Sequence, residues 1–234
     1  MLMQVTHRLP ASNKLLAALP HPEYRRLLAS LEPITLAFGE VLYEPGDVVR
    51  YVYFPNDSLI SLLTLVDPPL ALEVGMVGHE GMVGVSLALG VSLSPVRALV
   101  QGAGTAMRMK AAPFRKELRH SLALQRQVGL YAHELMIQIA QTAACNRFHV
   151  VEARLARWLL MTRDRVGSDH FHLTHEFIGH MLGVRRVGVT HAAHAIKQRG
   201  LIDYSRGNID IIDGPGLEAS ACSCYRRAKD SYQA

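Results

Sequence analysis

Basic and polar side chains gather at helical spacing in the last third of the sequence. Arg185 and Arg186 are followed by Thr190, His191 and His194, at steps that place side chains on one face of an α-helix. These residue types can donate hydrogen bonds to phosphate oxygens and to the edges of base pairs. An arginine near the start of such a helix can hold O6 and N7 of guanine with two hydrogen bonds, worth about 1–3 kcal/mol. The pattern favours contact with DNA, with Arg186 as the leading base-reading residue.

Two short helices joined by a tight turn are expected to position these side chains. Thr174 can cap the first helix, and Gly183 can take the left-handed conformation that ends it. The second helix then runs to Gly200. Its other face is apolar and comprises Val189, Ala192, Ala193 and Ile196. A second helix that is buried on one side and basic on the other is typical of a helix-turn-helix.

A hairpin is expected directly after the second helix. Residues 201–204 and 209–212 are short strand-like runs, and Ser205-Arg206-Gly207-Asn208 between them is a turn sequence. Such a hairpin adds the wing of a winged helix. We expect Thr174, His175 and Arg206 to contact phosphate, which fixes position on DNA and reads little sequence. A packed helical turn plus hairpin inside a core is the structural alternative.

The first hundred or so residues predict short helices followed by β-structure. Leucines between residues 15 and 31 suit one or two short helices, interrupted by Pro20 and Pro22. Short apolar runs then alternate with turn residues as far as residue 109, which favours an antiparallel barrel or roll. The expected strands include residues 48–54, 59–66, 71–74 and 97–101, with turns at 44–47, 55–57 and 67–69.

A long helix is expected from Pro113, because proline is tolerated in a first helical turn. Between residues 114 and 144 the sequence has no proline and one glycine. The apolar residues Val128, Ala132, Leu135 and Ile139 recur at three- and four-residue steps and form a narrow stripe suited to pairing with a second helix. An ordinary core helix is the alternative interpretation of this stripe.

These motifs together resemble a known family of bacterial regulators. The segment LTHEFIGHMLG at residues 173–183, followed by Arg186 and Leu201-Ile202, is similar to the DNA-binding domain of the Crp/Fnr transcription regulators. The strand-rich half resembles the cyclic-nucleotide-binding-type roll of that family more loosely, through Gly39, Gly46-Asp47 and Gly81 to Gly84. The resemblance implies a homodimer that binds a two-fold symmetric DNA site, contacts RNA polymerase, and activates or represses transcription.

The resemblance implies an α+β architecture in four parts. These are a β-roll sensor domain over residues 1–112, a dimerisation helix over 113–146, a winged helix-turn-helix over 147–217 and a C-terminal tail over 218–234. A signal in the roll would change the relative pose of two recognition helices through the dimerisation helix. The sequence names no effector.

The recognition helix departs from the family's pattern at three positions. The best-known base-reading face of the family is Arg-Glu followed four residues later by Arg, but Val187 and His191 replace the Glu and the second Arg. Val187 can touch a thymine methyl and cannot accept a hydrogen bond from cytosine, so the half-site should differ. Arg185 stands where a small capping residue is common, so a cap worth about 1 kcal/mol is expected to be missing.

The roll lacks the residues with which some members bind cyclic AMP. Those members carry Gly-Glu for the ribose and Arg-Ser for the cyclic phosphate, and no register of residues 81–84 and 92–97 supplies both. Arg97 is the only Lys or Arg between Arg50 and Arg108, so it is the candidate effector-binding residue. A buried phosphate without a well-placed arginine is poorly compensated, and we predict that cyclic AMP is not the effector.

No cofactor and no metal are expected from the sequence. The iron–sulfur cluster of the oxygen-sensing members needs four cysteines, and this chain has three, Cys145, Cys222 and Cys224, none of them in the roll. Cys222 and Cys224 are interpreted as a surface pair, and Cys145 as a packed, inert thiol. His191 and His194 share a helix face, but the sequence offers no third ligand near them.

Composition excludes several protein classes. The 234 residues are 49% hydrophobic and 19% charged with a net charge of +5, which indicates a globular chain of one large or two small domains. No run reaches the roughly 20 apolar residues of a membrane helix, and three cysteines fit a reducing compartment, so a cytoplasmic location is expected.

No catalytic constellation is marked, so we do not expect an enzyme. A small-molecule or metal sensor that acts through protein partners is the alternative.

Overall fold

Two small antiparallel sheets form the N-terminal half of the protein. The computed structural model describes residues 13–66 and 71–231, so the expected turn at 67–69 lies outside the described residues. One sheet has the order β1-β7-β3, formed by Glu32–Leu36, Gly104–Lys110 and Tyr51–Pro55. The other has the order β2-β6-β4-β5, formed by Val41–Tyr43, Arg97–Gly102, Leu59–Leu65 and Ala71–Val77. One hydrophobic core takes side chains from both sheets, as the predicted roll requires.

Short helices surround this roll. Helices α1 (Lys14–Ala17) and α2 (His21–Leu28) precede the strands, as the leucine pattern predicts, and a 3₁₀ helix, η1 (Val85–Leu89), follows β5. Asn13 ties the start of α1 to the roll, because its side-chain amide donates to the carbonyls of Pro55 and Gly81 at 2.9 and 2.8 Å. The mixed helix and sheet architecture confirms the expected fold class.

The long helical stretch is two helices and not one. Helix α3 spans Ala111–His120, with Pro113 in its first turn, and α4 spans Leu122–Phe148. The break is at Ser121, which has extended backbone angles and accepts a 2.9 Å hydrogen bond from the backbone N–H of Leu124. A serine that satisfies a free first-turn N–H in this way starts a new helix, so the expected dimerisation helix over 113–146 is interrupted.

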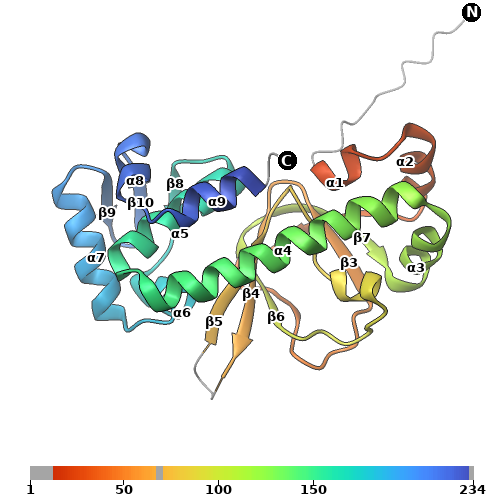
Figure 1. The fold of residues 1–234 in the computed structure, drawn as a ribbon, viewed down its shortest axis with the longest axis horizontal. Helices are drawn as coiled ribbons and strands as arrows, with labels where there is room; N and C mark the ends of the chain where they lie inside the picture. The colour runs from red at the N-terminus through yellow and green to blue at the C-terminus, as the bar shows by residue number, and fades with distance from the viewer. Residues whose placement is uncertain (1–12, 67–70, 232–234) are drawn as a thin grey trace, which may run out of the picture.

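Helix α4 runs diagonally across the whole molecule and links its two ends (Figure 1). One face is buried against the rest of the chain at three- and four-residue steps, comprising Leu124, Val128, Tyr131, Leu135, Gln138, Thr142 and Cys145. The ring of Tyr131 lies directly on Gly81, where an added Cβ would come within 2.0 Å of a ring carbon. The first half of the helix therefore packs on the roll, and its C-terminal end packs against α9 and the segment before it.

The C-terminal half is a second, mainly helical unit. Its elements are α5 (Val151–Val166), β8 (His170–His172), α6 (His175–Leu182), α7 (Arg186–Gln198), β9 (Ile202–Ser205), β10 (Asn208–Ile211), α8 (Gly214–Ser220) and α9 (Cys224–Ser231). Its core also contains Leu59, Leu63 and Met76 of the roll, so the two halves share buried surface. At this junction, the Trp158 indole N–H donates to the Glu73 carboxylate at 2.9 Å.

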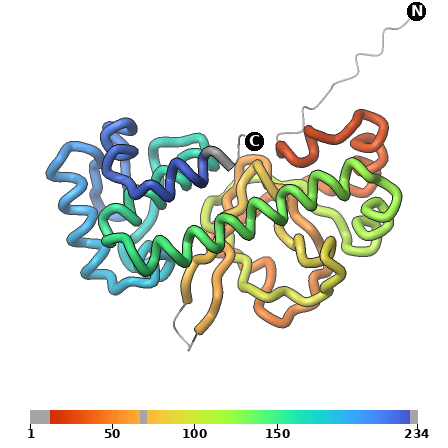
Figure 2. Tube along the Cα trace, viewed as in Figure 1, coloured from red at the N-terminus to blue at the C-terminus, as the bar shows by residue number. Residues whose placement is uncertain are grey.

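The expected C-terminal tail is largely helical. Helix α8 begins at Asp213, whose side chain caps the N–H of Gly216 at 2.9 Å, with Pro215 in the first turn. Helix α9 packs beside α4 and α5, and the tube trace shows it returning along them (Figure 2). The Asp-Gly-Pro sequence is a helix-start signal that predicts α8. Among the described residues, no helix combines the length and apolar character needed to cross a membrane.

Candidate nucleic-acid interface

Helices α6 and α7 form the expected helix-turn-helix. The Thr174 hydroxyl accepts a 3.2 Å hydrogen bond from the N–H of Phe177 and so starts α6. Gly183 ends that helix at φ 61°, in the left-handed region that favours glycine. Helix α7 starts at Arg185 with no side-chain cap, as the sequence predicts. The helix-turn-helix therefore has a capped helix start at α6 and an uncapped helix start at α7.

The two faces of α7 differ sharply. Its buried face packs into the domain core and comprises Val189, Ala192, Ala193 and Ile196. The opposite face is exposed and carries Arg186, Val187, Thr190, His191 and His194. Arg185 and Arg186 form no ion pair with a carboxylate anywhere among residues 13–66 and 71–231. The arrangement leaves both guanidinium groups available to an external anion.

His175 occupies a structural position between the helices and the wing. Its Nδ1 lies 3.0 Å from the Thr190 hydroxyl, and its ring stacks on Tyr204 at 4.0 Å between centroids. Because the Thr190 hydroxyl donates to the Arg186 carbonyl at 3.1 Å, Nδ1 is assigned as the donor to Thr190. Burial and the nearby charge of Arg186 lower the pKa of this imidazole. His175 thus fixes the position of Thr190, and its expected contact with phosphate stays a prediction.

The wing is a three-stranded sheet. The predicted hairpin is present as β9 and β10, and β8 adds a third strand that sequence reasoning missed, in the order β8-β10-β9. Three residues with alternating exposure, His-Phe-His, are too short a pattern to identify as a strand. Arg206 stands exposed in the turn with φ 50°, next to Gly207 with φ 88°. Positive φ at both turn residues suits a two-residue hairpin and places Arg206 at the wing tip.

The comparisons with known proteins agree with this geometry. Residues 153–220 match the family model of the Crp-like helix-turn-helix domain. The chain has a Crp-like helix-turn-helix domain on a Crp/Fnr fold. A regulator of the Crp/Fnr family from Eubacterium rectale superposes with a TM-score of 0.69 at 16% identity, over 89% of this chain and 98% of that one.

Two further solved structures have the same fold. FixK2 from Bradyrhizobium japonicum gives a TM-score of 0.70 at 13% identity, over 82% of this chain and 98% of that one. The c-di-GMP responsive global regulator CLP of Xanthomonas campestris gives 0.67 at 14% identity, over 82% and 99%. No curated protein matches the sequence.

The Crp-like domain contacts the roll through its turn. A Cβ added at Gly183 would lie 2.7 Å from the Cδ1 atom of Leu72 in β5, so the turn and this strand are in close contact. The next residue of β5, Glu73, accepts a hydrogen bond from the indole N–H of Trp158 in α5. These contacts give the roll a direct mechanical connection to the helix-turn-helix.

The roll contains an apolar cavity against α4. It has a volume of about 400 Å³ and lies between strand residues such as Leu62, Val74 and Ala98 and the helix residues Ala132 and Met136. Among the residues that the structure describes, no arginine or lysine lines it. Arg97, the sequence candidate for effector binding, lies outside this lining, and its guanidinium pairs with Glu44 at 2.9 Å. Its neighbours Val96 and Ala98 line the cavity instead.

The expected dimerisation stripe is divided between the chain's own core and the surface. Val128 and Leu135 are buried within the chain, so they are not available to a partner helix. Ala132 and Ile139 lie at the margin of the cavity. The exposed large apolar side chains of α4 are Leu122, Leu130, Met136, Ile137, Ile139 and Phe148. The roll of the same chain covers Val128 and Leu135 at the centre of the stripe, and the part of α4 in dimerisation stays a prediction.

Proposed function

We propose that this protein is a sequence-specific DNA-binding transcription regulator that binds a two-fold symmetric site as a homodimer. The observation that carries the proposal is the exposed face of α7, where Arg186 and its neighbours have no carboxylate partner among the described residues. An amphipathic helix of this kind fits the major groove, with the residues of its first turns nearest the base edges.

Each residue of the interface has its own proposed contact with DNA or its own supporting role. Arg186 reads guanine, and Val187 contacts a thymine methyl beside it. Thr190, His191 and His194 continue along the groove, while Thr174, Arg185 and the wing residue Arg206 contact phosphate. His175 supports this surface by holding Thr190 and Tyr204 in place.

The homodimer would form through the exposed ridge of α4. Met136 is 62% exposed and Ile137 39% exposed, although both are apolar. Parallel packing of two such ridges would remove this surface from water and place two α7 helices on one face of DNA. Met136→Glu should raise the dimer dissociation constant at least tenfold in analytical ultracentrifugation. Val48→Glu, an equally exposed site in the roll, is the matched control and should leave the dimer intact.

Control of the regulator is proposed to start in the roll cavity. Its described lining is mostly apolar and holds no Lys or Arg, which suits a small apolar molecule and disfavours a cyclic nucleotide. A ligand between β5 and α4 would shift Leu72 and Glu73, which contact the Crp-like domain. RNA polymerase as a partner and the cytoplasm as location belong to the same proposal, because both follow from transcription control.

The test is selection of bound sequences from a random DNA pool by the full chain at a stated salt concentration. We expect a two-fold symmetric motif with half-sites about one helical turn apart. Binding that is weak, equal for all sequences and steeply salt-dependent, both alone and with cell metabolites added, would contradict the proposal. That outcome would favour a sensor that acts through protein partners.

A further inference from the structure

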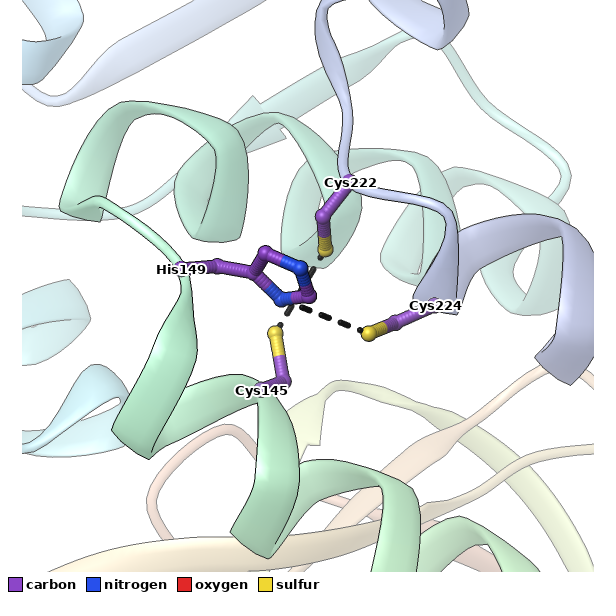
Figure 3. A group of neighbouring side chains, drawn as sticks. All are labelled: Cys145, His149, Cys222 and Cys224. Carbon is purple, nitrogen blue, oxygen red and sulfur yellow. Dashed lines mark hydrogen bonds between the residues drawn. The ribbon is translucent and has the colours of Figure 1, made fainter.

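Three cysteines and one histidine meet where α4 ends. The ligand atoms of Cys145, His149, Cys222 and Cys224 all lie within 4.8 Å of one another. The Cys145 and Cys222 sulfur atoms are 3.5 Å apart, and His149 Nδ1 lies 3.5 Å from the Cys224 sulfur (Figure 3). All three thiols are buried, so the interpretation of Cys222 and Cys224 as a surface pair is wrong.

Two segments distant in sequence supply these residues in pairs. Cys145 lies in the last turn of α4, and His149 caps that helix with its N–H bonded to the Cys145 carbonyl at 3.1 Å. A four-residue step places both side chains on one side of the helix end. Cys222 precedes α9 and Cys224 begins it, and the N–H of Tyr225 bonds to the Cys222 carbonyl at 3.0 Å in the turn between them. Each pair is therefore held by its own local backbone structure.

The spacing of the four atoms fits a single tetrahedral ion. Zinc–sulfur bonds of about 2.3 Å and zinc–nitrogen bonds of about 2.0 Å set ligand atoms about 3.5–3.8 Å apart. Two of the separations, Cys145 Sγ to Cys222 Sγ and Cys224 Sγ to His149 Nδ1, are 3.5 Å and agree with this geometry, and all four atoms lie within 4.8 Å of one another. An iron–sulfur cluster places several iron and sulfide atoms between its ligands, so it needs a wider set of thiolates. A disulfide between Cys145 and Cys222 would leave His149 and Cys224 without a function.

The surroundings of the cluster favour negative charge. Arg154 and Arg157 of α5 are 6% and 4% exposed and form no ion pair within the described part of the chain. The Nε atoms of both guanidinium groups are buried without a hydrogen-bond partner there. Arg157 lies near enough to Cys145 and Cys222 for its positive charge to act on both sulfur atoms. Three thiolates and one divalent cation carry a net charge of −1, which these arginines compensate.

We propose that Cys145, His149, Cys222 and Cys224 bind one Zn²⁺ ion per chain. On binding, each thiol loses its proton to solvent, the three sulfurs and the imidazole Nδ1 donate electron pairs, and no redox change takes place. Gln141 supports the site, because its side-chain N–H donates to the Cys224 sulfur at 2.9 Å. The ion would join the end of α4 to the α8–α9 connection and fix the point where the Crp-like domain leaves the long helix.

Metal analysis of the full-length protein tests this site without reference to DNA. The protein is purified under reducing conditions without chelator, and its metals are measured by plasma mass spectrometry. We expect one zinc per chain, with the thiols protected from alkylation until the metal is removed. Three freely reactive thiols without zinc, iron with acid-labile sulfide, or a Cys145–Cys222 disulfide would each overturn the proposal.

Variants assign the ligands one by one. Cys222→Ser and Cys224→Ser should each lose zinc, whereas Ser223→Ala, at the exposed residue between them, should retain it. His133→Gln, an exposed histidine on the same helix, should also retain the metal.

His149→Cys keeps the protein testable if the serine variants fail to fold, because it retains four ligands. Protein produced in cobalt-supplemented medium should show the strong visible absorption of tetrahedral Co²⁺ and a sulfur-to-cobalt charge-transfer band. This band should strengthen in His149→Cys, because a fourth thiolate is added. An unchanged band would exclude His149 as a ligand, and absence of any cobalt spectrum in the parent protein would overturn the site.

Discussion

Two arginines of the roll and the two arginines at the start of α7 differ in whether they pair with a carboxylate. In the roll, Arg97 pairs with Glu44 and Arg108 pairs with Glu32, each at 2.9 Å. In front of α7, Arg185 and Arg186 have no such partner among the described residues, although both are exposed. Internal pairing neutralises charge within the fold, whereas unpaired cations on a helix surface are available to a polyanion. The difference supports the proposed DNA contact at the α7 end of the molecule.

The largest expected effect is on the pH dependence of stability, through Glu73 at the junction between the roll and the Crp-like domain. Burial raises the pKa of Glu73 to about 7 from 4.5, and its hydrogen bonds with Ser61 and Trp158 only partly oppose this. The folded state therefore holds a proton that the unfolded state has lost, and this stability disappears as pH rises from 4.5 through 7. Between pH 5 and 8, the free energy of unfolding should fall by about 2–3 kcal/mol from this group.

Urea unfolding of the parent protein and Glu73→Gln at both pH values measures this effect. Gln retains an acceptor for Trp158 and cannot titrate, so the variant should lose the fall and be the more stable protein at pH 8. His175 acts in the opposite direction, because its lowered pKa removes stability as pH falls below 6.5. Comparing the parent protein with Glu73→Gln at the same pH cancels the contribution of His175, because both proteins contain it. Equal pH profiles for both proteins would contradict a buried, neutral Glu73.

The basic face of α7 gives the next effect. Arg186→Ala should weaken binding to the selected DNA site about 10- to 100-fold and relax preference at one base pair, because a two-bond contact to guanine is lost. Arg119→Ala removes the same charge from α3, near the other end of α4, and is the control (Figure 1). Fluorescence anisotropy at fixed salt measures both. An equal loss in the two variants would mean that net charge, and not base reading, determines affinity.

The two helix starts of the helix-turn-helix give a smaller effect. Thr174→Ala removes the cap of α6 and should cost about 1 kcal/mol of stability. Arg185→Ser adds a side-chain acceptor at the uncapped start of α7 and should add up to about 1 kcal/mol, while it weakens DNA binding through loss of a phosphate contact. Thermal unfolding and anisotropy together separate the two properties. A change of the same sign in both for Arg185→Ser would argue against this assignment.

The last prediction is that cyclic AMP has no effect through the roll cavity. Cyclic AMP should produce no binding heat in calorimetry and no change in DNA affinity, because no arginine or lysine of the described residues lines the cavity to compensate its phosphate. Micromolar binding would show that the phosphate finds a cation elsewhere, with Arg97 released from Glu44 as the first to examine. Ala98→Arg places a guanidinium in the lining and is the sharper form of the test.

Local signals made the helix-turn-helix predictable. Thr174, Gly183 and the Ser205–Asn208 turn each act within a few residues, and a buried face at steps of three and four identifies α7 wherever it is placed. The break at Ser121 is also local, but serine is common inside helices, so its side-chain bond to Leu124 became evident only in the structure. The same holds for His175, whose stacking on Tyr204 joins residues far apart in the chain.

The sequence by itself determined the elements that short-range chemistry controls: the two helices and the turn of the helix-turn-helix, the hairpin of the wing and the basic face of α7. Only the tertiary structure decided which apolar residues of α4 face the roll, and that Arg97 turns away from the cavity to Glu44. It also brought Cys145 to within 3.5 Å of Cys222, 77 residues away in the chain. Sequence patterns report neighbours along one element, whereas ligand sets and cavities are made by packing between elements, where sequence distance carries no information.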